Sequence, residues 1–242
     1  MNDHTLAQIH VAVLAGGLGT RLRPVLTDRP KILAPIDGRP FIDYLFTWLA
    51  SFGASKVVLC LGHLAENVTD YLKANPALFD VHISVESKPA GTAGALRLAR
   101  PLLTSDPVLV LNGDSFVDAD LGKALALHHA LASPATLICP EVDDTSRFGS
   151  VDVDEKGGIV RFVEKGAASG AGFINGGIYF FSAAFLDEIC GSGSRSLEYD
   201  VLAKQPSGRM HALTGRFRFV DIGLPETLQS TRADTLTSGA PR

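Results

Sequence analysis

Short apolar runs rich in β-branched residues alternate with helical patterns along the first part of this chain. The apolar runs predict five strands, at residues 9–14, 56–61, 81–86, 108–111 and 136–139. The helical patterns lie between them, at residues 40–52, 64–74, 93–103 and 121–131. Because buried parallel strands are apolar on both faces, this alternation predicts an α/β fold with a mainly parallel sheet covered by helices on both sides.

The pattern changes after Arg147. The remaining segments predict a hairpin around the turn DEKGG at 147–166, a loop at 167–172, a strand at 176–182, a short helix at 194–203, a strand at 216–223 and a helix from about residue 225. Ser194 or Ser196 would cap the short helix. We expect residues 233–242 to form a frayed tail. No internal repeat or linker is present, so we expect a single domain over residues 1–242.

Composition argues against several classes of function. The chain has 242 residues and a net charge of −4, with its Lys and Arg spread out, which argues against general binding to nucleic acid or to a membrane surface. Cys60, Cys139 and Cys190 lie far apart and predict buried, reduced thiols rather than a zinc site. The N-terminus lacks the apolar core of a signal peptide, and Asp43 interrupts the longest apolar segment. We therefore expect a cytoplasmic protein with no membrane span.

A glycine-rich loop follows the first predicted strand. The three glycines within residues 16–19 would let backbone N–H groups approach anionic oxygens at the carboxyl edge of the sheet, where such folds bind ligands. Arg21 and Lys31 would flank one site if residues 24–30 fold back, and this pair of cations suits a polyphosphate. The alternative is an ordinary turn with two solvated cations.

Two familiar phosphate loops do not fit this segment. The Walker pattern ends in Gly-Lys-Ser/Thr, whereas this loop reads Gly-Thr-Arg. The dinucleotide fingerprint needs a third glycine where the chain has Leu22. Residues 31–41 also carry only one acid, Asp37, in a turn-like segment. A hydride-transferring dinucleotide enzyme is therefore disfavoured.

A resemblance to a known family rests on six motifs. LAGGLGTRLRPVLTDRPKILAPI at 14–36 resembles the signature of the sugar-1-phosphate nucleotidylyltransferases. The similarity continues through GTAGAL (91–96), LNGDSF (111–116), FGSVDVDEKGGIVRFVEK (148–165), NGGIYFF (175–181) and FVDIGLPE (219–226). The resemblance implies a nucleotide-diphospho-sugar transferase fold, a Rossmann-like three-layer α/β sandwich with a mainly parallel mixed sheet. It also implies a nucleotide-binding part at about 9–140, a sugar-phosphate-binding part at about 141–230 and a tail at 231–242.

The resemblance implies a reaction between a nucleoside triphosphate and a sugar 1-phosphate. In this family a phosphate oxygen of the sugar attacks the α-phosphorus in line, and pyrophosphate leaves. The nucleophile is already an anion, so the chemistry needs positioning and charge neutralisation rather than a general base. Asp114 follows a buried strand and Asp221 ends a late one, and two carboxylates suit Mg²⁺ as cofactor. Alone, Asp114 could equally be a turn or cap residue.

The resemblance assigns roles to further residues. The implied catalytic residues are Arg21, Lys31, Asp114, Lys165 and Asp221. The implied nucleotide-binding residues are Leu14, Ala15, Gly16, Gly17, Gly19, Thr20, Glu86, Gly91, Thr92, Gly94, Asn112 and Gly113. The implied sugar-phosphate-binding residues are Gly149, Glu164, Lys165, Asn175 and Glu198. We expect Glu86 to accept hydrogen bonds from N1–H and the exocyclic amine of guanine, although a surface carboxylate is the alternative.

Within the family, this short form is most similar to the D-glycero-D-manno-heptose 1-phosphate guanylyltransferases, which make GDP-heptose for bacterial surface polysaccharides. Mannose-1-phosphate guanylyltransferase, glucose-1-phosphate cytidylyltransferase and N-acetylmuramate-1-phosphate uridylyltransferase remain open. A non-catalytic, nucleotide-sensing subunit is an alternative of another class. Such a chain would be expected to lose charged site residues, and this one keeps them. The oligomeric state is left open, a homo-oligomer included.

Overall fold

The computed structural model describes residues 5–22, 24–163 and 169–237. Its centre is an eight-stranded sheet made of β1 (His10–Leu14), β4 (Lys56–Leu61), β5 (Asp80–Val85), β6 (Val108–Asn112), β8 (Ala135–Val142), β11 (Gly172–Phe173), β12 (Ile178–Phe181) and β13 (His211–Gly215). The strand order is β11-β8-β12-β6-β1-β4-β5, and β13 pairs with β8. Strand β12 runs antiparallel between β6 and β8, while β5, β4, β1 and β6 are parallel. The prediction of a mainly parallel mixed sheet is confirmed.

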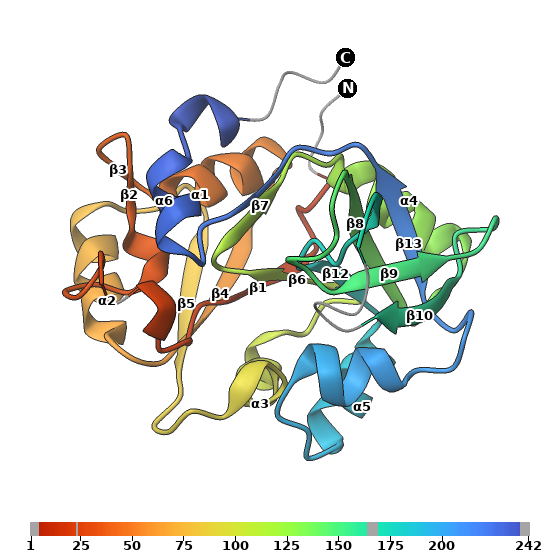
Figure 1. The fold of residues 1–242 in the computed structure, drawn as a ribbon. Helices are drawn as coiled ribbons and strands as arrows, with labels where there is room; N and C mark the ends of the chain where they lie inside the picture. Colours follow the sequence, from red (N-terminus) through yellow and green to blue (C-terminus); the bar gives the residue numbers. More distant parts are fainter. Residues whose placement is uncertain (1–4, 23, 164–168, 238–242) are drawn as a thin grey trace.

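The described residues form six α-helices: α1 (Phe41–Ser51), α2 (Ala65–Ala74), α3 (Gly91–Ala99), α4 (Leu121–Ala130), α5 (Ala183–Gly191) and α6 (Pro225–Ser230). They lie around the sheet (Figure 1). Alternate residues of each strand face opposite layers. Val11 and Val13 of β1 pack with α1, α2 and α4, whereas Ala12 packs with α3 and α5. Each fully buried Val or Leu contributes about 1.5–3 kcal/mol relative to exposure. The result is the three-layer sandwich that was expected.

Three small antiparallel pairs lie outside the central sheet. They are β2 (Pro35–Ile36) with β3 (Arg39–Pro40), β7 (Ser115–Val117) with β14 (Phe219–Asp221), and β9 (Ser150–Val153) with β10 (Ile159–Val163). The β9–β10 pair confirms the predicted hairpin. The late strand is shorter than the predicted 216–223, and it pairs with β7 instead of joining the sheet. Strand β13 was not predicted, since only Ala212 of its five residues is buried and its sequence HALTG has little apolar character.

Residues 194–203 form the expected short helical segment. Its first part, Leu197–Val201, is a π-helix, and a 3₁₀ turn follows at Leu202–Lys204. The Ser196 hydroxyl accepts a hydrogen bond from the Tyr199 N–H at 3.1 Å, so Ser196 rather than Ser194 is the cap. This segment packs beside α3, which begins at Gly91, two residues earlier than predicted.

The expectation of a frayed tail is wrong for residues 233–237. Ala233–Thr235 form a 3₁₀ turn, and the Ala233 N–H donates to Asp37 Oδ2 at 2.8 Å. The Leu236 side chain is only 2% exposed, because it joins the core that contains α1. One apolar residue in a polar stretch anchors this part of the chain. Residues 238–242, the rest of the expected tail, and residues 167 and 168 of the expected loop lie outside the described residues.

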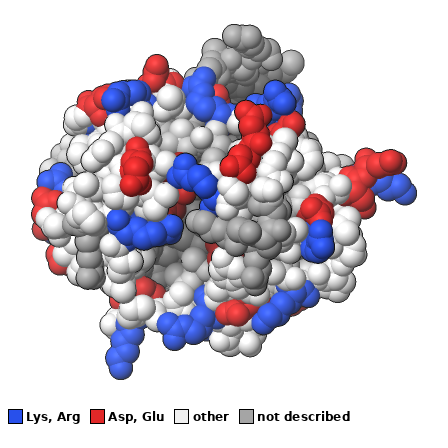
Figure 2. Space-filling model, in the orientation of Figure 1, with Lys and Arg blue, Asp and Glu red and all other residues white. Residues whose placement is uncertain are grey.

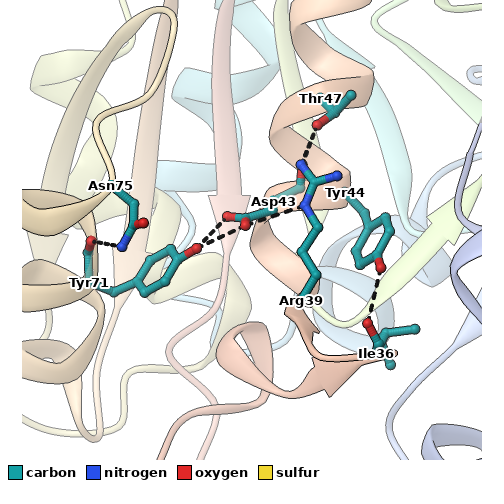
Figure 3. A network of polar contacts seen from close by, with 7 residues as sticks. All are labelled: Ile36, Arg39, Asp43, Tyr44, Thr47, Tyr71 and Asn75. Carbon is teal, nitrogen blue, oxygen red and sulfur yellow. Dashed lines mark hydrogen bonds and ion pairs between the residues drawn. The ribbon is translucent and has the colours of Figure 1, made fainter.

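A polar network accounts for Asp43, the acid that interrupts the apolar segment of α1 (Figure 3). The Tyr71 hydroxyl, on α2, lies 2.8 Å from both oxygens of Asp43. Arg39 donates to Thr47 Oγ1 at 2.8 Å and to the Asp43 carbonyl at 3.1 Å. Burial and the Asp43 carboxylate together raise the pKa of Tyr71 to about 12. Asp43 therefore links α1 to α2 through hydrogen bonds.

The cysteines were expected to be buried, reduced thiols, and two of the three are buried. Cys60 and Cys139 are buried free thiols, and burial raises the pKa of each to about 12. Cys190 is a half-buried free thiol, so it departs from the expectation of burial. Over the described part of the chain, every helix is too short or too polar to cross a bilayer.

The buried His128, on α4, is expected to lower the stability of the protein as the pH falls. Its side chain is 4% exposed, Nδ1 lies 3.1 Å from Thr136 Oγ1, and burial lowers its pKa from 6.5 to about 4. The unfolded chain therefore binds a proton at a higher pH than the native state. The stabilising contribution is complete above pH 6.5 and is lost as the pH falls from 6.5 towards 4, by about 2 kcal/mol at pH 4.5.

Urea unfolding between pH 7 and pH 4.5 measures this effect. We expect His128→Gln to remove about 2 kcal/mol of the pH dependence of the unfolding free energy. His129→Gln is the matched control, because the neighbouring His129 is exposed on the same helix. An unchanged pH dependence in His128→Gln would exclude His128 as the cause.

Candidate active site

The carboxyl ends of four parallel strands meet at one edge of the sheet. Leu14 of β1 is in register with Cys60 of β4 on one side and with Asn112 of β6 on the other. The Gly113 N–H donates to the Leu14 carbonyl at 2.8 Å, and a Cβ on Gly113 would lie 2.9 Å from that oxygen. Glycine is therefore required where the segments after β1 and β6 touch. The loops that follow these strands are gathered at a single site.

The glycine loop brings Lys31 to this edge. Gly19 has a φ of +60°, in the left-handed region that favours glycine, and a short helix follows at Thr20–Leu22. A Cβ on Gly19 would lie 3.5 Å from Lys31 Cγ, so the lysine stem lies against the loop. The predicted fold-back of the chain between the loop and Lys31 is confirmed.

Two carboxylates that are distant in sequence meet beside Lys31. Lys31 Nζ donates to Asp114 Oδ2 at 3.0 Å, directly after β6. The pairing of β7 with β14 places Asp221 opposite Ser115, and the Ile222 N–H donates to the Asp114 carbonyl at 3.0 Å. The β7–β14 pair is therefore the element that brings Asp221 next to Asp114.

The electrostatics of Asp221 reflect this arrangement. Burial is the largest cause that raises the pKa of Asp221 above its ordinary value, and the Asp114 charge adds to it. A hydrogen bond from the Gly223 N–H at 2.6 Å and the charges of Lys31 and Arg21 act in the opposite direction. Burial therefore outweighs these contacts, and the ionised form of Asp221 is disfavoured in the folded protein.

Two adjoining cavities open at the carboxyl edge. The first, cavity A, has a volume of about 290 Å³, and the second, cavity B, about 500 Å³. Both are lined by Asn112, Asp114 and Glu198. A ligand in one cavity would therefore meet a ligand in the other beside Asp114.

Cavity A contains most of the residues predicted to bind a nucleotide. Those that line it are Leu14, Ala15, Gly16, Gly17, Glu86, Gly91, Thr92, Asn112 and Gly113, together with Lys31 and Asp114. Three predicted residues do not line it. Gly19 packs against Lys31, Thr20 is exposed, and Gly94 is buried in α3, where a Cβ would lie 2.6 Å from Ala90 Cβ. The segment GTAG forms the first turn of α3.

Glu86 lies in cavity A rather than on the outer surface. It follows β5, and its Oε2 accepts a hydrogen bond from the Ala90 N–H at 2.9 Å. A Cβ on Gly62 would lie 2.8 Å from Oε1, so the carboxylate packs directly over glycine backbone at the end of β4. The carboxylate is held in place on both sides, as a group that recognises a ligand must be.

Cavity B contains the described residues predicted to bind a sugar phosphate. Gly149, Asn175 and Glu198 line it, as do Arg21 and Asp221. Asn175 Nδ2 donates to the Tyr179 hydroxyl at 2.8 Å, and Asn175 Oδ1 accepts from the Gly177 N–H at 3.0 Å. These two bonds fix the side-chain amide. Glu164 and Lys165, also predicted here, lie outside the described residues.

Sequence reasoning missed one cation and several aromatic residues of cavity B. The aromatic residues are Phe148, Phe162, Tyr199 and Phe219. The Arg147 guanidinium lies 5.8 Å from the Phe148 ring centroid, and the Phe148 and Phe219 rings meet edge to face. Arg147 directly precedes the motif that starts at Phe148, which was the available signal. The aromatic residues come from separate segments, so no local pattern grouped them.

The donor set suits a hard divalent cation. Over residues 5–22, 24–163 and 169–237, no group of three or more His, Cys, Asp or Glu side chains could hold a metal ion. Asp114 and Asp221 are two carboxylates in one cavity, and the pKa of Asp221 is raised partly by the Asp114 charge. Mg²⁺ typically takes one or two carboxylates and completes its shell with waters and substrate phosphates. The residues present therefore fit Mg²⁺.

The surface charges are mixed. Figure 2 shows Lys and Arg interspersed with Asp and Glu over the face in view, without an extended basic patch. The cavities also contain cations, since Arg21 and Arg147 line cavity B and Lys31 lines cavity A. The acids Glu86, Asp114, Glu198 and Asp221 line the same cavities, so the charge there is mixed as well.

Two curated proteins are similar to this chain over most of its length. The D-glycero-alpha-D-manno-heptose 1-phosphate guanylyltransferase of Aneurinibacillus thermoaerophilus is 32% identical over 223 residues, which cover 92% of this chain and 96% of that protein. The mannose-1-phosphate guanylyltransferase catalytic subunit beta of Xenopus tropicalis is 34% identical, and the match covers 88% of this chain but 61% of that protein.

A solved structure shares the fold at similar sequence identity. The crystal structure of HddC from Yersinia pseudotuberculosis complexed with GMP-PN has a TM-score of 0.80 and 34% sequence identity. The match covers 91% of this chain and 96% of that one. In addition, the model of the nucleotidyl transferase family matches residues 10–237. The chain therefore belongs to the nucleotidyl transferase family.

Proposed function

We propose that this protein is a sugar-1-phosphate guanylyltransferase that transfers GMP from GTP to D-glycero-D-manno-heptose 1-phosphate and releases pyrophosphate. The observation that carries the proposal is the meeting of two cavities at Asp114, with Lys31 and Asp221 beside it. A reaction between two phosphorylated substrates needs two pockets that meet where charge must be neutralised. The name of the Aneurinibacillus relative and the GMP-PN in the HddC complex support the guanine and heptose assignments.

The nucleotide occupies cavity A in this proposal. The backbone at Gly16 and Gly17 approaches the phosphates, and Lys31 neutralises their charge. Glu86 lies in the same cavity, and its carboxylate accepts hydrogen bonds from N1–H and the exocyclic amine of guanine. Uracil cannot offer that pair of donors, and cytosine offers only the amine. The carboxylate thus selects GTP among the common nucleotides.

The sugar 1-phosphate occupies cavity B. Its phosphate oxygen attacks the α-phosphorus, a new P–O bond forms, and the bond to the pyrophosphate oxygen breaks with its electron pair leaving on pyrophosphate. The attacking oxygen is already ionised, so no side chain needs to remove a proton. Arg21 lines this cavity and Lys31 the adjoining one, and both stabilise the negative charge that accumulates as the phosphates approach.

Asp114 and Asp221 would hold Mg²⁺. When bound, Mg²⁺ supplies charge neutralisation and a rigid arrangement of phosphate oxygens. The role of the two carboxylates would be to hold that ion where the two cavities meet. Lys165, which the family resemblance places on the sugar phosphate, would add a further cation.

We favour heptose over mannose as the sugar because the match spans 96% of the heptose 1-phosphate guanylyltransferase and 61% of the mannose-1-phosphate guanylyltransferase subunit. Arg21, Lys31, Asp114 and Asp221 all line the two cavities, which favours a catalytic protein over a nucleotide-sensing subunit.

The proposed reaction consumes GTP, so we place it in the cytoplasm, where its product would supply GDP-heptose for surface polysaccharides, capsule or lipopolysaccharide.

Pyrophosphate release with Mg²⁺ tests the proposal. GTP, CTP, UTP, ATP and dTTP are each combined with heptose, mannose, glucose and N-acetylmuramate 1-phosphates. We expect the highest kcat/KM for GTP with D-glycero-D-manno-heptose 1-phosphate. A maximum for mannose 1-phosphate would mean that mannose, not heptose, is the sugar of the substrate. A maximum for another nucleotide would mean that the base is not guanine. No turnover in any combination by folded protein would favour the nucleotide-sensing alternative.

A further inference from the structure

The start of α3, in cavity A, is attached directly to the segment that carries Glu198. Gly91 has a φ of +79°, and a Cβ there would lie 2.4 Å from the Arg195 carbonyl oxygen. The Ala93 N–H donates to the same oxygen at 2.9 Å. Only a glycine permits this approach, and α3 therefore holds the segment 195–198 through backbone contacts.

The Thr92 hydroxyl makes the side-chain part of this attachment. Thr92 Oγ1 donates to Glu198 Oε2 at 3.2 Å and accepts from the Leu197 N–H at 2.7 Å. Its single proton is therefore given to Glu198 rather than to a ligand in cavity A. The family resemblance assigns Thr92 to the nucleotide, whereas these bonds direct its hydroxyl to Glu198, a residue that lines both cavities.

Glu198 is held through one oxygen only. Oε2 accepts from Thr92 and, at 3.3 Å, from the Ser196 hydroxyl. Oε1 accepts no hydrogen bond from the described residues, although Glu198 lines both cavities. The Ser196 hydroxyl also accepts from the Tyr199 N–H as a helix cap, so Ser196 stays with its own turn. Among the described residues, Thr92 is the one donor to Glu198 that comes from a different element of the fold.

We infer that Thr92 is a positioning residue for the sugar 1-phosphate: its hydroxyl orients Glu198 so that the second carboxylate oxygen can accept hydrogen bonds from sugar hydroxyls. Thr92 thus acts on the substrate in cavity B from the wall of cavity A. The inference rests on the proposed function, and it goes beyond that function by moving Thr92 from nucleotide binding to sugar positioning.

Steady-state kinetics of Thr92→Val test the inference. Valine keeps the shape of threonine but removes the hydroxyl. We expect the KM for the sugar 1-phosphate to rise about tenfold, the loss typical of one hydrogen bond to a charged group, while the KM for GTP changes less than about twofold. Thr92→Ser should restore the wild-type KM for the sugar, because serine keeps the hydroxyl. Thr69→Val, on α2 and away from both cavities, is the matched control.

A double-mutant cycle with Glu198→Ala supplies the decisive comparison. We expect Thr92→Val to add little to the defect of Glu198→Ala, because both changes remove the hydrogen bond between the two side chains. A rise in the KM for GTP alone would overturn the inference in favour of nucleotide binding. Equal rises in both KM values with a lowered melting temperature, unrescued by serine, would show a merely structural role and overturn it as well.

The wild-type protein tests the proposed function separately. If it turns over no substrate pair, that function fails. Calorimetric titration of wild type and Thr92→Val with the sugar 1-phosphate then still measures whether Thr92 affects binding in cavity B. Equal affinities in that titration would overturn the inference by itself.

Discussion

Asp221→Asn is expected to lower kcat/KM by about 10³-fold at saturating Mg²⁺, since it removes one of the two charges that would hold the ion. Asparagine keeps Oδ1, which accepts the Gly223 N–H at 2.6 Å, so the local backbone should be retained. The fold should become more stable. The pKa of Asp221 is raised by burial and by Asp114, so its ionised form at pH 7 destabilises the native state. A neutral amide removes that effect.

Melting curves give a readout independent of activity. Mg²⁺ should raise the melting temperature of the wild-type protein and not that of Asp221→Asn. Asp70→Asn is the control, because Asp70 is an exposed acid on α2 whose partner is Lys73. Full wild-type turnover in excess EDTA would contradict the metal assignment. Near-wild-type activity of Asp221→Asn would remove this carboxylate from the mechanism.

Glu86→Gln is expected to lower kcat/KM for GTP by roughly 30- to 150-fold, which corresponds to about 2–3 kcal/mol for hydrogen bonds to a charged acceptor. The amide presents a donor where guanine also presents donors, so one bond becomes a repulsive contact. Adenine offers an acceptor next to its amine and suits an amide better. The preference for GTP over ATP should therefore narrow.

The control for this variant is Glu66→Gln, an exposed acid in the first turn of α2. Competition between GTP and ATP in one reaction measures the preference directly. An unaltered nucleotide profile in Glu86→Gln would mean that Glu86 does not contact the base. A uniform loss with all nucleotides would point to the hydrogen bond from the Ala90 N–H as the role of this carboxylate.

Cavity B is lined by aromatic residues as well as by charged ones, and Tyr199 is one of them. Tyr199 is 60% exposed. It lies one residue beyond Glu198, at the wall of the same cavity. The short π-helix therefore presents a carboxylate and an aromatic ring together, a combination that suits a sugar.

Much of the fold follows from local patterns. The five predicted strands of the first 140 residues and the four helices between them are present, with ends shifted by a few residues. These elements are long and strongly apolar, and their periodicity reports burial directly. Strand β13 and the anchored Leu236 were missed because single buried residues in polar segments leave no periodic signal.

Part of the candidate site could also be predicted from the sequence. The glycine loop, Lys31 and Asp114 follow β1 and β6, and parallel strands necessarily bring such loops to one edge. Gly94 and Thr20 do not line cavity A, because a motif does not say which of its residues face the cavity. Thr92 lines the cavity, but its hydroxyl is directed to a distant segment.

The sequence by itself determined the class of fold, the glycine-rich loop at the carboxyl edge of the sheet and the resemblance to the family. Only the tertiary structure decided that Asp221 lies beside Asp114, that Glu198 lines both cavities and that Thr92 holds it. The reason is physical. Periodicity and turn residues reflect the environment of each short segment, whereas the pairing of β7 with β14 and the contact of α3 with residues 195–198 depend on how the whole chain packs.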